Sequence, residues 1–115
     1  MRNLILAAAL LASPAYAQDP TTLQAVTTRG IVMKTSFGLE IPVTYSPDGK
    51  FSAQPPGAAV HGAWRIVDGT TLCTHTETDP TETCAVYPSG KKAGDTFEVD
   101  GAMGPAMGKV TIQIK

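Results

Sequence analysis

The chain of 115 residues holds two cysteines, Cys73 and Cys84, which could form a disulfide, hold a metal ion or exchange thiols. Thiol exchange favours two cysteines separated by two residues at the start of a helix, and the spacing here is much longer. A copper or zinc site would need at least three converging ligands, such as imidazole or soft thioether groups. The weak candidates for such ligands are His61, His75, Met103 and Met107. We therefore expect no redox centre and no resident cofactor, and we favour a disulfide.

Carboxylates gather in the segment 74–83, between the two cysteines. Paired carboxylates can act as acid and base, and clustered carboxylates can hold calcium. The segment lacks the glycine and the ligand spacing of a calcium-binding loop. We therefore predict a solvent-exposed, disulfide-bracketed loop that could contact a partner. Its candidate contact residues are Glu77, Asp79, Pro80 and Glu82.

Nucleophilic catalysis would need a serine or cysteine beside a histidine and an orienting carboxylate. After the first seventeen residues, serines occur at positions 36, 46, 52 and 89. None of them lies in the sharp strand-to-helix turn that exposes a nucleophile in hydrolases. The sequence therefore predicts no catalytic residues, and we expect that the protein is not an enzyme.

Residues 1–17 have the parts of a secretory signal peptide. Arg2 is basic, Leu4 to Ala12 form a short apolar run, and small residues at 15 and 17 form a cleavage site. Cleavage near Ala17 would release a periplasmic or secreted protein with no transmembrane anchor. Because such compartments favour disulfides, we predict a bond between Cys73 and Cys84. Closing this loop would stabilise the fold by roughly 3 kcal/mol.

The remaining sequence predicts one small β domain. Residues 18–29 are polar and predict an N-terminal arm, either loose or with one short helical turn, and residues 30–115 predict a single disulfide-braced domain. Apolar and polar side chains alternate in 39–45 and 109–115, which is typical of strands with one buried face. Eleven glycines and nine prolines leave little room for long helices. The predicted fold is all-β: a single antiparallel meander of six to eight short strands in a curled sheet or small barrel, with a β-sandwich as the alternative.

A tight turn at Asp68-Gly69 predicts how the central strands pair. With these two residues as the whole turn, Trp64 faces Cys73 and its indole packs against the disulfide. The threonines then suit the exposed faces of the strands. The predicted core side chains are Trp64, Ile66, Val86, Phe97, Val110, Ile112 and Ile114.

The segments "GAWRIVDGTTLCT" and "CAVYPSGKKAGDTFEV" carry a resemblance within residues 62–99. Their pattern is similar to small exported bacterial proteins of unknown function. Those proteins read G-x-W, an Asp-Gly turn, L-C, a short polar loop, C, and then Y-P-x-G-K-K-x-G-D with an aromatic residue two positions later. In this chain Phe97 takes the aromatic position, where the family often has tryptophan. The resemblance implies a fold and export, and it implies no activity.

The composition also limits the partners of this protein. The net charge is −1 and the basic residues are scattered, so nothing resembles the dense basic surface that nucleic acids require. We expect an exported binding or structural module of the cell envelope, with an envelope protein, a glycan or a small apolar ligand as partner. The first alternative is an inhibitor-like protein that presents the loop 74–83. A periplasmic copper or zinc binder is the least favoured.

Overall fold

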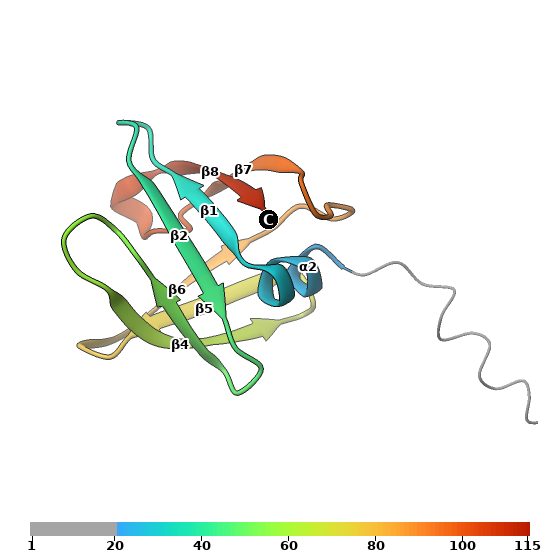
Figure 1. Cartoon of the computed structure of the whole chain (residues 1–115). Coiled ribbons are helices and arrows are strands. Elements are labelled where there is room, and N and C mark those ends of the chain that lie inside the picture. Colours follow the sequence, from blue (N-terminus) through green and yellow to red (C-terminus); the bar gives the residue numbers. More distant parts are fainter. Residues whose placement is uncertain (1–20) are drawn as a thin grey trace, which may run out of the picture.

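The computed structural model describes residues 21–115, so the predicted signal peptide lies outside the described residues. Residues 21–115 form eight strands, one α-helix and one short 3₁₀ helix (Figure 1). The elements are α2 (Thr22–Arg29), β1 (Ile31–Lys34), β2 (Glu40–Tyr45), β3 (Lys50–Ala53), β4 (Val60–Val67), β5 (Thr71–Thr76), β6 (Asp79–Val86), β7 (Thr96–Asp100), η1 (Pro105–Met107) and β8 (Lys109–Ile114). In this part of the chain no helix has the length and apolarity that a membrane crossing requires.

All eight strands belong to one antiparallel sheet in the order β6-β5-β4-β3-β2-β1-β8-β7. Successive strands pair along the chain, and β8 returns to pair with β1. The two edge strands, β6 and β7, are therefore neighbours in sequence but not in the hydrogen-bonded ladder. The sheet is curled into a half-barrel, and in Figure 1 β2 crosses in front of β4 and β5. The predicted all-β meander with a curled sheet is confirmed, and a single sheet replaces the alternative of a sandwich.

Branched aliphatic side chains fill the part of the curled sheet formed by β1, β8 and β7. The alternation in β8 directs Val110, Ile112 and Ile114 inward, and all three are almost fully buried. Phe97 of β7 is buried beside them, as predicted for all four residues. Each fully buried side chain of this kind stabilises a fold by about 1.5–3 kcal/mol.

The helix α2 closes one end of this core, where a polar arm was predicted. Thr21 caps the helix: its hydroxyl accepts from the Gln24 amide at 3.0 Å, and the Gln24 side chain accepts from the Thr21 amide at 2.8 Å. This capping box stabilises a helix start. Leu23 and Val26 are buried against the sheet. Of the two forms expected for 18–29, the structure shows the helical one over Thr22–Arg29, which two apolar side chains one turn apart anchor to the sheet.

The predicted register of the β4–β5 hairpin is wrong by one residue. Val67 pairs with Thr71, so the loop has three residues instead of two. Asp68 and Gly69 both adopt positive φ, at 55° and 74°, as the sequence favours, but Thr70 adds a third loop position. A one-residue slip moves every side chain of a strand to the opposite face. Trp64 consequently pairs with Thr74 and does not lie on the same face as Cys73.

Two predicted core residues, Ile66 and Val86, are exposed. Ile66 lies near the end of β4 and is 37% exposed, and Val86 lies on the outer face of β6 and is 67% exposed. Leu72 and Ala85 are buried instead, because the corrected register turns them inward. Trp64 is partly buried against the core, away from the disulfide.

Candidate functional site

The inner side of the curled sheet encloses a cavity of about 420 Å³, which is open to solvent along part of its wall. Small-molecule sites in proteins typically have volumes of roughly 300–1,000 Å³. Most of the residues that line the cavity come from β2 to β6, and several of them also belong to the buried core. Inward positions of β5 and β6 carry small side chains such as Thr74, Thr83 and Ala85, which leave this space unfilled.

The cavity extends to the end of the half-barrel opposite α2, which we call its open end. The chain leaves α2, enters β1 and then alternates in direction, so the connections 35–39, 54–59, 77–78 and 101–108 all lie at that far end. Leu39, Pro55 and Met103 come from these connections or their borders, and all three line the cavity. The open end is therefore bordered by loops, whereas the closed end lies beside the helix.

One wall of the cavity is apolar. It is built by inward side chains that alternate along β1, β2 and β3, with Leu72 from β5. These side chains include Met33, Ile41, Val43, Phe51, Ala53 and Leu72. Burying such surface against an apolar ligand is favourable by roughly 25 cal/mol per Å².

The opposite wall carries hydroxyl groups. Thr74 and Thr76 of β5, and Thr81 and Thr83 of β6, all line the cavity. Thr74 and Thr83 lie directly opposite each other on neighbouring strands. The prediction that threonines occupy exposed strand faces holds for Thr81 but is wrong for Thr74, Thr76 and Thr83, which are partly buried. The corrected register brings them inside, where they form a polar strip along one wall.

Tyr45 and Tyr87 line the cavity near its closed end, after the strands that run back toward α2. The Tyr45 ring packs edge-on against Trp64, with ring centroids 6.0 Å apart. The Trp64 indole donates to the carbonyl oxygens of Ser46 at 3.1 Å and Lys50 at 2.9 Å, which fixes its orientation. Tyr45 is thus held by a ring that is itself anchored to the backbone.

Burial raises the pKa of both phenols. For Tyr45 the loss of solvation is the larger cause, and the nearby Tyr87 adds to it. For Tyr87 burial alone raises the pKa. Both hydroxyls are therefore neutral at physiological pH and can donate a hydrogen bond. Within residues 21–115 neither hydroxyl has a protein hydrogen-bond partner.

Charged groups reach the cavity only at its open end. Asp79 begins β6, and His75 lies near the end of β5. Hydrogen bonds from Thr81, including its amide at 3.0 Å, lower the pKa of Asp79, so this carboxylate stays ionised. The lining residues include neither lysine nor arginine.

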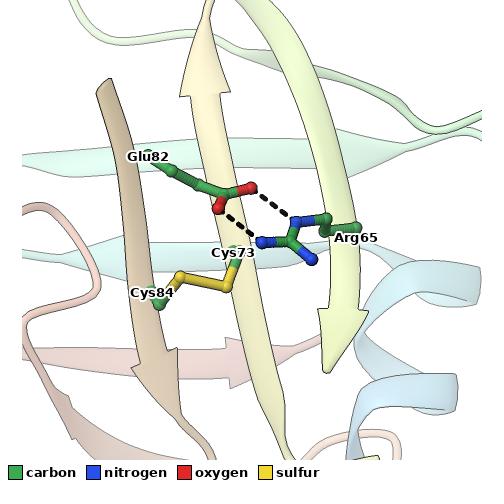
Figure 2. A network of polar contacts seen from close by, with 4 residues as sticks. All are labelled: Arg65, Cys73, Glu82 and Cys84. Carbon is green, nitrogen blue, oxygen red and sulfur yellow. Dashed lines mark hydrogen bonds and ion pairs between the residues drawn. A yellow bond between two sulfur atoms is a disulfide. The ribbon is translucent and has the colours of Figure 1, made fainter. Parts of the chain in front are cut away.

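The disulfide lies on the opposite, outer face of the sheet. Cys73 and Cys84 are bonded and face each other directly across β5 and β6, with Cα atoms 4.0 Å apart. Arg65 and Glu82 reach across the strand that carries Cys73 and form two hydrogen bonds of 2.7 Å each (Figure 2). The predicted disulfide is confirmed, and it braces the edge strand β6.

The predicted interaction loop 74–83 is not a loop. Thr74 to Thr76 continue β5, and β6 already begins at Asp79, so only two residues form the turn. Pro80 lies within the edge strand, where a bulge shifts the register. Edge strands tolerate proline because one of their sides forms no hydrogen-bonded ladder. A segment with proline and several carboxylates can therefore form the end of an edge strand as well as a loop. Glu77 is exposed in the turn, and Glu82 is engaged by Arg65.

The predicted metal ligands do not form one cluster. In the described part of the chain, the acidic, cysteine and histidine groups close enough to share an ion are Cys73, Glu82 and Cys84, whose sulfurs are already bonded to each other. His61 is exposed on β4, and His75 borders the cavity. Met103 also lines the cavity, and Met107 lies in η1.

Comparisons with protein-family models, with curated proteins and with solved structures found no match to this chain. The sequence did not predict this site. The structure alone defines it, as one cavity surrounded by an apolar wall, a threonine strip and two phenols. The signal for it was present in the alternating threonines of 74–83, but only the correct register assigns them to the interior.

Proposed function

We propose that this protein is an exported binding module that holds a small, largely apolar molecule inside its curled sheet. The cavity of about 420 Å³ supports this function most directly, because it is large, open and mainly apolar. The disulfide supports export, since such bonds persist in oxidising compartments. A cell-envelope location rests on the predicted signal peptide.

The geometry favours this function over the inhibitor-like alternative. An inhibitory loop would have to project from the domain, and the segment 74–83 consists of two paired strand ends joined by a two-residue turn. A structural role in the envelope would need no open interior. The unfilled cavity is thus the feature that separates ligand binding from the other two roles.

The test uses N-phenyl-1-naphthylamine, an uncharged apolar fluorophore whose emission rises when it leaves water. We expect saturable binding to the mature chain with one site per molecule. Thr83→Leu places a larger side chain inside the cavity and should weaken binding at least tenfold. Val86→Leu on the outer face of the same strand is the matched control and should bind as the natural protein does. Binding that does not saturate, or that Thr83→Leu leaves unchanged, would refute the proposed function.

A further inference from the structure

Two phenol hydroxyls at the closed end of the cavity lack protein hydrogen-bond partners within residues 21–115. Tyr45 and Tyr87 approach this end from different strands, β2 and the residue after β6. A buried hydroxyl without a partner is unfavourable, and an oxygen atom of a ligand that accepts from it removes that cost. The two tyrosines can therefore act as a pair of hydrogen-bond donors to a ligand in the cavity.

The side chains that line the cavity disfavour ionised ligands. A carboxylate or phosphate inside the cavity would find no lysine or arginine, and Asp79 at the open end would repel it. An amine would find its only carboxylate, Asp79, at the open end and none near the phenols. His75, the one imidazole among the lining side chains, also lies at the open end, away from the tyrosines.

The two walls of the cavity differ in polarity, so they fit a ligand that is apolar on one side and polar on the other. The wall of β1, β2 and β3 contacts an apolar body, and the threonine strip of β5 and β6 tolerates polar groups along one side. We propose that the ligand is an uncharged amphipathic molecule whose oxygen atom accepts hydrogen bonds from Tyr45 and Tyr87 and whose apolar body extends toward the open end. This inference rests on the proposed function and names the chemical class of its ligand.

Displacement of N-phenyl-1-naphthylamine by three compounds of equal chain length tests this class. The compounds are decan-1-ol, decanoate and decylamine, each used below its micellar concentration. We expect decan-1-ol to displace the fluorophore at a concentration at least tenfold lower than either ionised compound. Tyr45→Phe and Tyr87→Phe should each weaken decan-1-ol about threefold to tenfold, the effect of losing one hydrogen bond.

Thr71→Val is the control for these variants, because it removes a hydroxyl that lies opposite the exposed Val86 on the outer face. Circular dichroism spectra that match that of the natural protein show that the variants are folded. Displacement by decanoate or decylamine as strong as that by decan-1-ol would refute an uncharged ligand, while fluorophore binding would still support the proposed function. Phenylalanine variants that bind decan-1-ol normally would refute the donor pair. Failure of the natural protein to bind the fluorophore would refute the proposed function itself.

Discussion

The ring of Tyr87 lies edge-on to the ring of Phe97, with centroids 6.0 Å apart and planes inclined by 72°. Tyr87 follows the edge strand β6, and Phe97 lies in the opposite edge strand β7. These two strands share no hydrogen-bonded ladder in the described sheet. The aromatic contact therefore joins the two edges of the curled sheet, and it does so at the closed end of the cavity.

Removing the Tyr87 ring should weaken the contact between the two edges of the curled sheet. Tyr87→Ala loses a buried aromatic side chain and its contact with Phe97, so we expect the free energy of unfolding to fall by about 3–5 kcal/mol. Tyr87→Phe keeps the ring and loses a hydroxyl that has no protein partner, so its change should stay below about 1 kcal/mol. Urea denaturation followed by circular dichroism measures both. Equal losses for the two variants would contradict the role of the ring.

Gly62 is buried where β3, β4 and β5 meet, and no larger residue fits there. A Cβ atom at this position would lie 2.0 Å from the His75 carbonyl oxygen and 2.6 Å from the Phe51 ring. Gly62→Ala should therefore destabilise the protein by about 1–3 kcal/mol or more, because the backbone of β5 has to move. Ala63→Ser, the next residue, is the control and should change stability little. Thermal denaturation of both variants gives the comparison.

The disulfide should stabilise the fold without influencing Trp64. Cys73 and Cys84 close a short loop at the sheet edge, and replacing both by serine should cost about 3 kcal/mol. Trp64 lies on the other face of β4, so its fluorescence should stay unchanged when the bond is reduced in the still-folded protein. A rise in emission on reduction, before any unfolding, would place the indole against the sulfurs and contradict the observed register.

The ion pair of Arg65 and Glu82 should stabilise the protein at neutral pH and should not stabilise it in strong acid. Hydrogen bonds from Arg65 lower the pKa of Glu82 in the folded state. Such a group contributes stability above its unfolded pKa of about 4.3, and this contribution is lost as the pH falls through the lower folded value. Arg65→Gln should therefore be less stable than the natural protein at neutral pH and equally stable in strong acid.

Because both side chains are partly exposed, at 63% and 31%, added salt should also reduce this difference. Urea denaturation at several pH values and salt concentrations provides the measurement. A difference between Arg65→Gln and the natural protein that persists below the titration of Glu82 would show that the arginine stabilises by packing instead.

The sequence predicts most of the strands because period-two alternation survives wherever one face is buried. In β8 this pattern correctly identified Val110, Ile112 and Ile114 as core residues. The same rule failed in β4 and β5, where the length of one turn decides which face is buried. Asp68-Gly69 has the composition of a two-residue turn, and the inclusion of Thr70 follows from the pairing of the whole sheet.

The cavity could not be predicted from the sequence for a related reason. Its volume depends on how far the sheet curls, and the pattern of single strands does not specify that curvature. Small inward residues such as Thr83 and Ala85 leave space in the interior, and nothing in the pattern of a single strand shows whether another side chain fills it. The sequence left the helix α2 as one of two possibilities, because its two buried residues, Leu23 and Val26, lie in an otherwise polar segment.

Locating a bound ligand by NMR tests the central claim most directly. With decan-1-ol bound, we expect nuclear Overhauser contacts from its alkyl chain to the methyl groups of Val43, Leu72 and Thr83, all inside the cavity. We expect none to Val86, which is exposed on the outer face. Contacts to Val86 alone, or no contacts to the inward methyl groups at saturating ligand, would contradict the claim that the ligand binds inside the curled sheet.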